Sequence, residues 1–262
     1  MITHNFDPVL FDFYVFQIRW YSLAYIFGIF FGWIYAKKII KNINKNSSLN
    51  KLQSKDFDDF IIYLVIGIIL GGRIGYVLIY NLSYYLKNLH EIFYIWNGGM
   101  SFHGGLLGVI FATIIFTKKR KINPFLYLDI IACVSPIGLF FGRIANFINS
   151  ELYGKLTNLP WGVVFPNVGE LPRHPSQIYE AILEGLVLFA ILNFLALKKK
   201  LIFKTGFISI CFLFLYSIFR FFSENFREPD EQLGYMLYSL TMGQLLSFIT
   251  ILFALTIYYK IK

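Results

Sequence analysis

The chain has 262 residues, of which 57% are hydrophobic, 20% aromatic and only 15% charged, and its formal net charge at pH 7 is +9. A soluble domain usually carries about 25% charged residues, so this composition excludes an ordinary soluble globular protein. Long apolar runs explain the deficit, because a helix that crosses the hydrocarbon core of a bilayer requires about 20 mostly apolar residues.

Seven apolar segments are long enough to cross a bilayer as helices, which satisfy their own backbone polar groups in lipid. In chain order these segments are 16–36, 57–80, 101–117, 125–146, 178–197, 204–222 and 238–259. We therefore predict an all-α, polytopic membrane protein that forms a single domain over residues 1–262. Residues 1–15 contain no Lys or Arg, so they do not predict a cleavable signal peptide.

The positive charges indicate the orientation of the chain. Most of the Lys and Arg residues lie in alternate connections, namely 37–55, 118–121 and 198–204, and at the C-terminal end. Positive residues favour the cytoplasmic side, which predicts an N-terminus outside and a C-terminus inside. The basic excess is thus explained by topology, and no nucleic-acid partner is predicted.

Two connections differ in composition. Residues 41–55 are rich in Asn, Lys and Ser, which predicts a solvated inner connector. Residues 150–177 contain four prolines and several glycines, which predicts an ordered or partly re-entrant outer loop rather than a helix. Within the spans, glycines recur at four-residue spacing, as at 67, 71 and 75, and such faces let helix backbones approach closely.

Ionisable and polar side chains gather near the outer ends of the predicted spans. Such residues are costly in a membrane, at roughly 2.5–3.5 kcal/mol each at a helix centre, so they need a partner or a function. The residues at this level are Tyr21, Arg73, His103, Arg143, Asn146, Gln177, Glu180, Glu184, Arg220 and Glu224. Helical spacing places Arg143 on one face with Asn146, and Arg220 on one face with Glu224 and Arg227.

Two interpretations of this outer cluster remain open at the level of sequence. The arginines can form interhelical salt bridges, for example Arg143 with Glu151 or Arg220 with Glu224. Alternatively they line a pocket for an anionic group, because the planar guanidinium donates two parallel hydrogen bonds to a phosphate. His103 and His174 are candidate general bases, since histidine titrates near neutral pH. No metal-ligand motif, P-loop or dinucleotide fingerprint is present, so no metal or cofactor is predicted.

One motif resembles a known family. The thirteen residues from Gly142 to Gly154, GRIANFINSELYG, resemble the signature of bacterial prolipoprotein diacylglyceryl transferases. The likeness extends over nearly the whole chain, through Trp20-Tyr21, Gly72-Arg73-Ile74-Gly75-Tyr76, His103-Gly104-Gly105, Arg173-His174-Pro175-Ser176-Gln177, Phe219-Arg220, Arg227-Glu228-Pro229-Asp230 and Met242-Gly243-Gln244.

The resemblance implies a multi-pass enzyme of the bacterial inner membrane whose active site faces the outer leaflet and the periplasm. Its partners would be phosphatidylglycerol, whose diacylglyceryl group moves to the thiol of a preprolipoprotein lipobox cysteine, and the surrounding bilayer. Glycerol phosphate would leave as a thioether forms, in the first step of lipoprotein maturation. The catalytic residues implied are His103, Arg143, Arg220 and Tyr21, and the lipid-binding residues are Arg143, Asn146, Glu151, Gly154, Arg73, Glu224 and Arg227.

Three features of this resemblance stay open. The proton of the thiol can pass to His103, to Glu151 or to a water. Asn97 stands where the family often has an acid, and Ala145 stands where it usually has glycine.

The competing functions are a transporter or flippase for an anionic lipid or solute, and a membrane scaffold without activity. Transporters place polar groups at the midplane between inverted repeats, and this chain has neither feature.

Overall fold

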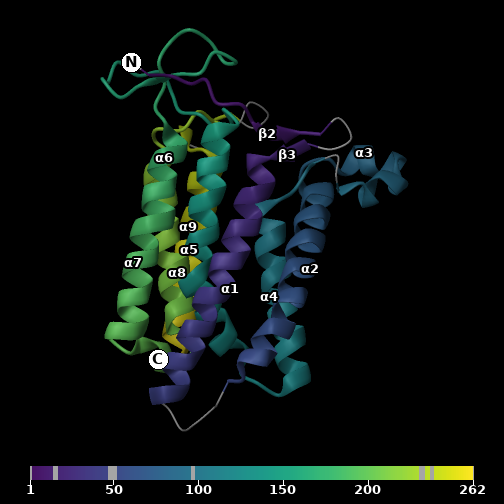
Figure 1. Ribbon diagram of the computed structural model, residues 1–262, viewed down its shortest axis with the longest axis vertical. Helices are drawn as coiled ribbons and strands as arrows, with labels where there is room; N and C mark the ends of the chain where they lie inside the picture. Colours follow the sequence, from purple (N-terminus) through teal and green to yellow (C-terminus); the bar gives the residue numbers. More distant parts are fainter. Residues whose placement is uncertain are drawn as a thin grey trace. The chain divides into compact units, whose positions relative to one another are not determined.

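The computed structural model describes residues 2–13, 17–46, 52–95, 98–229, 234–236 and 239–261, and these are mostly helical. Each of the seven apolar segments contains a helix. The helices are α1 (Trp20–Asn46), α2 (Ser54–Ile79), α4 (Phe102–Arg120), α5 (Pro124–Ile148), a continuous fifth helix, α8 (Phe207–Ser223) and α9 (Met242–Ile261) (Figure 1). The fifth helix comprises α6 (Ser176–Glu180), the π-helix η3 (Ala181–Val187), α7 (Leu188–Asn193) and the π-helix η4 (Phe194–Lys198).

Within the described residues, five of these helices are long and apolar enough to cross a membrane. They are α1, α2, α5, the helix from Ser176 to Lys198, and α9 over Met242–Tyr259. Helix α8 is a shorter apolar helix of 17 residues. Length and composition of these helices therefore support a multi-pass membrane protein.

The structure is consistent with the all-α prediction, and a few short strands and helices lie outside the long helices. Strand β1 (Ile2–Thr3) pairs in parallel with β4 (Val163–Val164), and β2 (Val9–Asp12) pairs antiparallel with β3 (Gln17–Arg19). The first span was predicted to begin at residue 16, whereas β3 occupies Gln17–Arg19 and α1 begins at Trp20. Helix α3 (Leu82–Lys87), η1 (Leu89–Phe93) and η5 (Leu201–Phe203) lie in connections.

Helix α1 also continues beyond its predicted end at residue 36. Ile39, Ile40 and Ile43 are at most 4% exposed, so this extension buries an apolar face. The prediction of a solvated connector over 41–55 is therefore wrong as far as Asn46. The interspersed lysines and asparagines had concealed the helical period of the three isoleucines.

The chain forms two compact units, Met1–Ala36 with Asp129–Lys262, and Lys37–Leu128. In the second unit α2 packs on α4 through glycines, as the spacing predicted. A Cβ atom added to Gly75 would lie 2.6 Å from the Cα of Gly104, and one added to Gly67 would lie 2.8 Å from the Cβ of Ala112. Only glycine allows backbones to approach this closely.

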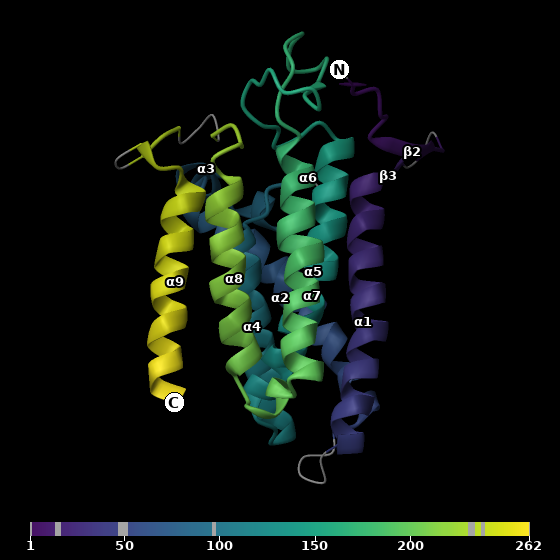
Figure 2. The same cartoon turned by 90° about the vertical axis from the view of Figure 1, so that its left-hand side faces the viewer.

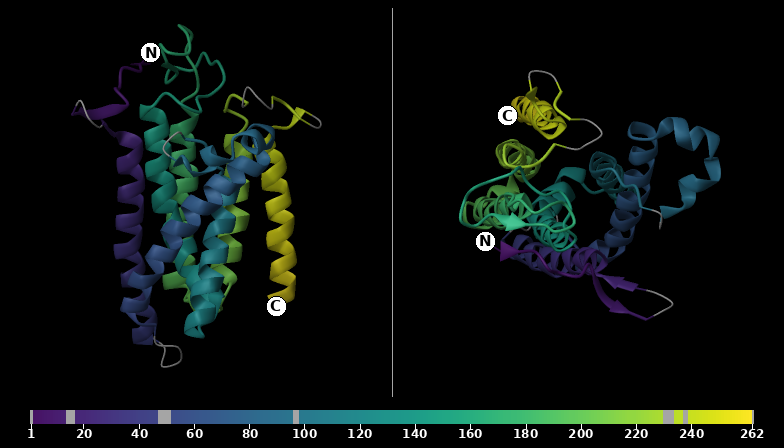
Figure 3. Two further views of the ribbon diagram at one scale, coloured as in Figure 1. Left: turned by 90° about the vertical axis from the view of Figure 1, so that its right-hand side faces the viewer. Right: turned by 90° about the horizontal axis from the view of Figure 1, so that it is seen from above.

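In the first unit α5 contacts both α1 and the fifth helix. Gly28 of α1 faces Gly138, where an added Cβ would lie 2.9 Å from its Cα, and Phe31 stacks on Phe141 with ring centroids 5.9 Å apart. Gly185 of η3 faces Phe140 on α5. Helices α8 and α9 run side by side, as Figure 2 shows and the view from above in Figure 3 repeats. The first unit thereby brings the ends of α5, α6, α8 and α9 into contact.

Candidate functional site

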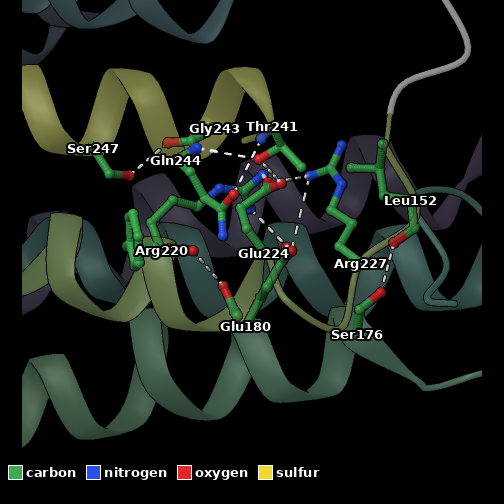
Figure 4. Close-up of polar contacts among 12 residues, drawn as sticks. Leu152, Ser176, Glu180, Arg220, Glu224, Arg227, Thr241, Gly243, Gln244 and Ser247 are labelled. Atoms are coloured by element: carbon green, nitrogen blue, oxygen red, sulfur yellow. Dashed lines mark hydrogen bonds and ion pairs between the residues drawn. The ribbon is translucent and has the colours of Figure 1, made fainter. Parts of the chain in front are cut away.

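Six charged side chains of the first unit form one network, called here the ion-pair cluster. Its members are Arg143, Glu180, Glu184, Arg220, Glu224 and Arg227. Helix α5 supplies Arg143, the fifth helix supplies two glutamates, and α8 with the turn that follows it supplies the rest. Figure 4 shows part of this cluster, where α8, the start of α9 and the fifth helix meet.

Two glutamates bridge two arginines at the centre of the cluster. Oε2 of Glu180 lies 2.8 Å from Nη1 of Arg143, and its Oε1 lies 2.9 Å from Nη1 of Arg220. Glu184 repeats the arrangement, with Oε2 3.0 Å from Nη2 of Arg143 and Oε1 3.6 Å from Nη1 of Arg220. Each carboxylate therefore directs one oxygen to each arginine.

Glu224 extends the cluster toward α9. Arg220 donates to Oε1 of Glu224, one turn along the chain, which confirms the pairing that the i,i+4 spacing predicted. Thr241 donates from its hydroxyl to Oε2 of the same carboxylate at 2.7 Å. Gly243 leaves room for it, because an added Cβ would lie 2.6 Å from the carboxyl carbon of Glu224. Arg227 completes the group, with Nη1 3.8 Å from Oε1 of Glu180.

Burial separates the acids from the bases. The side chains of Glu180 and Glu184 are 0% exposed, whereas those of Arg143 and Arg220 are 14% and 13% exposed. Three arginines face three glutamates, so the cluster has no net charge when all six groups are ionised. A buried charge is tolerated only when it is paired, and here every member has a partner. The arginines, rather than the acids, remain accessible to a ligand.

The turn after α5 places Asn146 beside Glu151. Nδ2 of Asn146 donates to Oε2 of Glu151 at 3.2 Å. The flanking residues Ser150 and Leu152 both have φ of 56°, which folds the chain back tightly. Gln177 fixes this turn to the fifth helix by donating to the backbone oxygen of Glu151 at 2.6 Å. Arg143 does form interhelical salt bridges, but the example given above, its pairing with Glu151, is wrong, because Arg143 pairs with the acids of the fifth helix.

Gly154 lies at a junction of three segments, where its small size is required. Its N–H donates to the backbone oxygen of His174 at 3.0 Å, and its own oxygen accepts from Nη1 of Arg173 at 3.1 Å. An added Cβ would lie 2.6 Å from the backbone oxygen of Phe226. This glycine therefore keeps the loop that follows α5 close to the turn after α8, which carries Arg227.

Two other residues were considered for catalysis: His174 lies near this junction, and Tyr21 lies on α1. Nδ1 of His174 lies 3.2 Å from the hydroxyl of Tyr179, and burial, together with the positive charge of Lys155, lowers the pKa of His174. The lowered pKa favours the neutral form of this imidazole. Tyr21, in the first turn of α1, has its hydroxyl 3.5 Å from that of Tyr25.

The remaining predicted site residues belong to the second unit. Arg73 is 3% exposed and gives its guanidinium to backbone oxygens of residues 91–99. His103 lies in the first turn of α4, whose start is capped when Ser101 accepts from the N–H of Gly104 at 3.2 Å. The side chain of His103 and the whole of Asn97 lie outside the described residues.

The sequence had placed Gln177, Glu180 and Glu184 among the polar residues near the ends of the spans but had not assigned the two glutamates to the site. The sequence did allow this assignment. Two acids one turn apart inside an apolar span require basic partners, and the basic residues predicted at the same depth were arginines of other spans. Thr241 carried no comparable signal. Among the described residues, no group of three or more His, Cys, Asp and Glu side chains is placed to hold a metal ion.

Comparison with known proteins identifies the family. The model of the family described as prolipoprotein diacylglyceryl transferase matches residues 8–260. The phosphatidylglycerol–prolipoprotein diacylglyceryl transferase of Rickettsia canadensis (strain McKiel) is 53% identical over 247 residues, which cover 94% of this chain and 93% of the relative. The protein of the same name from Rickettsia bellii (strain OSU 85-389) is 51% identical over 262 residues, covering 100% of this chain and 97% of the relative. The chain belongs to the prolipoprotein diacylglyceryl transferase family.

Proposed function

We propose that this member of the family transfers the diacylglyceryl group of phosphatidylglycerol to the thiol of a preprolipoprotein lipobox cysteine. The cysteine sulfur bonds to the glycerol carbon that carries the phosphate, the carbon–oxygen bond to the phosphate breaks, and glycerol phosphate leaves. The thiol proton passes to a base. The observation that supports this proposal is a pair of partly exposed arginines, Arg143 and Arg220, held together at the ends of apolar helices.

The arginines would stabilise the leaving group. Negative charge grows on the phosphate as the carbon–oxygen bond breaks, and preorganised donors in a low-dielectric site offset such charge most effectively. Arg143 and Arg220 can each donate N–H groups to the phosphate oxygens, since a guanidinium matches phosphate geometry. Asn146 and Glu151 next to them, with Tyr21, would position the lipid headgroup.

The nucleophile requires a base, because a free cysteine has a pKa of about 8.5 and its thiolate is the reactive form. His103 is the base that the family resemblance implies, and Glu151 or a water can replace it. We propose that Gly154, Glu224 and Arg227 complete the lipid-binding site, and that Arg73, whose guanidinium donates to backbone oxygens, does not contribute to it. No cofactor takes part in this scheme.

The direct test is the mass of a synthetic lipobox peptide after incubation with purified enzyme and phosphatidylglycerol. We expect a gain of one diacylglyceryl group, and no gain with phosphatidylethanolamine, whose zwitterionic headgroup should suit the arginine pair less well. Equal turnover of the two lipids would contradict an anionic headgroup site. A transporter or a scaffold would leave the peptide unchanged with either lipid.

The proposed placement is a bacterial inner membrane protein with seven spans, N-terminus outside and C-terminus inside, and an active site facing the outer leaflet. Single cysteines at positions 48 and 158, in a background without Cys133 and Cys211, test it. An impermeant thiol reagent added to intact cells should label position 158 and not position 48. The opposite labelling would reverse the orientation.

A further inference from the structure

The two fully buried acids of the fifth helix carry an inference that extends the proposed function and rests on it. We propose that Glu180 and Glu184 are positioning residues, which hold the guanidinium groups of Arg143 and Arg220 at a fixed separation so that both grip one phosphate. The two acids are called the glutamate pair below.

The shared oxygens indicate this role. Both Oε2 atoms of the glutamate pair face Arg143, at 2.8 and 3.0 Å, and both Oε1 atoms face Arg220, at 2.9 and 3.6 Å. Two guanidinium groups that approach one phosphate repel each other, and the repulsion is strong where water is excluded. A carboxylate between them offsets the repulsion and also fixes the distance, which a separate acid for each arginine would not do.

Among the described residues, the glutamate pair occupies only part of the donor capacity of Arg143. Nε and Nη2 donate to Oε2 of Glu184 at 3.3 and 3.0 Å, and Nη1 pairs with Glu180. A guanidinium has five N–H groups, so these contacts leave two for a ligand. The side chain is also 14% exposed while the acids are fully buried. The acids thus hold the inner part of the arginine and leave an outer part for the phosphate.

The backbone of the fifth helix sets where the glutamate pair stands. Glu184 lies in the π-helix η3, a form of helix that is rare and occurs frequently at functional sites. The next residue, Gly185, lies against α5, where an added Cβ would be 2.7 Å from the Cβ of Phe140. Arg143 lies on the same helix, three residues after Phe140. The contact between Gly185 and Phe140 therefore fixes the distance between Glu184 and Arg143.

The proposal predicts a particular split of the kinetic constants. Replacing Glu184 by glutamine raises the net charge of the ion-pair cluster from zero to +1, so the ground-state binding of an anionic lipid does not weaken. The two arginines lose one of the two carboxylates that they share, so their separation is held less firmly and the interaction that strengthens in the transition state is weakened. A change that acts only in the transition state lowers kcat and leaves KM in place.

The experiment uses the full chain in detergent micelles with phosphatidylglycerol and a lipobox peptide, and reports kcat and KM per mole of folded enzyme. For Glu184→Gln and Glu180→Gln we expect kcat to fall at least tenfold while KM for the lipid stays equal or decreases. Glu184→Asp, which keeps the charge but shortens the side chain, should fall between the wild type and Glu184→Gln. The matched control is Glu228→Gln, which removes a carboxylate from the half-exposed pair with Arg173 and should leave both constants unchanged.

A charge-neutral variant keeps the test valid if the glutamine variants fold poorly. Gly185→Ala should push η3 away from α5 and lower kcat at least tenfold, with no change in any charged group. Gly32→Ala is its control, because an added Cβ there lies 3.9 Å from Val134, an ordinary contact.

A kcat within twofold of the wild type in Glu184→Gln and Gly185→Ala would overturn the proposal, as would a raised KM with kcat unchanged. If Arg143→Lys also keeps full turnover, the proposed function of the arginines fails as well; normal turnover in the glutamate and glycine variants alone refutes only the positioning role.

Discussion

The two units hold the arginines of two similar motifs in different ways. Arg73 follows Gly72 in the motif Gly-Arg-Ile-Gly, and Arg143 follows Gly142 in Gly-Arg-Ile-Ala. In the second unit all five N–H groups of Arg73 point to backbone oxygens, those of residues 91, 92, 94, 98 and 99, at 2.5 to 3.2 Å. In the first unit Arg143 pairs with carboxylates.

This difference indicates different functions. A guanidinium whose five donors are all occupied by backbone oxygens has none left for a lipid, and at 3% exposure it orders the connection between α2 and α4. Arg143 has its charge balanced by acids, and its contacts with the described residues use three of its five N–H groups, while its side chain is 14% exposed. These contacts indicate a structural role for Arg73, which the family resemblance had placed among the lipid-binding residues, and they limit the proposed phosphate site to Arg143 and Arg220.

The largest effect is expected on stability at Arg73. Replacing it by alanine leaves five backbone oxygens without their donor, and we expect a loss of about 3–5 kcal/mol in the free energy of unfolding. Turnover per mole of enzyme that remains folded should stay close to that of the wild type. Thermal unfolding in detergent, measured beside turnover, checks both statements. An unchanged melting temperature with lost turnover would restore a lipid-binding role for Arg73.

The next effect is expected on turnover at Arg143. Lysine keeps the positive charge but loses the planar fork that donates two parallel hydrogen bonds to a phosphate. If Arg143 holds the phosphate in the transition state, Arg143→Lys should cost about 1.5–3 kcal/mol in the activation barrier, roughly a ten- to hundredfold loss of rate. Turnover should be measured beside the melting temperature. Near-normal turnover with a lowered melting temperature would make Arg143 a structural residue like Arg73.

The sequence predicted the positions of the long helices well, for a clear physical reason. A span of about 20 apolar residues is visible without any knowledge of its neighbours. The pairing of Arg220 with Glu224 was also predictable, because i,i+4 neighbours on a helix face each other. The helices did not end where the hydrophobicity ended, however: α1 extends to Asn46 on three buried isoleucines.

The partners of the arginines could not be predicted, because they depend on which helices become neighbours. Arg143 was three residues from Asn146 and eight from Glu151 in sequence, yet its acids come from residues 180 and 184 on another helix. Nothing local distinguished Arg73 from Arg143, since the carbonyl oxygens that bind Arg73 belong to a connection with irregular backbone. Long-range contacts of this kind follow from the tertiary fold and cannot be predicted from the spacing of residues along one helix.

The smallest expected effects concern the fourth position of the two motifs, where the second unit has Gly75 and the first unit has Ala145. A Cβ on Gly75 would lie 2.6 Å from the Cα of Gly104 and 3.1 Å from the Cβ of Ser101, so Gly75→Ala forces α2 and α4 apart. Overpacking of this kind costs about 1–3 kcal/mol in the free energy of unfolding. Ala145 is already accommodated at 2% exposure, so the reverse change meets no steric barrier.

Ala145→Gly should therefore lower stability only by the backbone entropy of glycine inside a helix, about 0.5–1 kcal/mol, with turnover unchanged. The two reciprocal changes turn each motif into the other, and thermal unfolding of both variants in the same detergent compares them directly. A larger loss of stability for Gly75→Ala than for Ala145→Gly would show that glycine is needed at position 75 because the backbones of α2 and α4 approach closely there. Equal losses of stability would mean that α2 and α4 move apart easily to accommodate the added methyl group. The ordering of the connection between them would then depend on the hydrogen bonds of Arg73 alone.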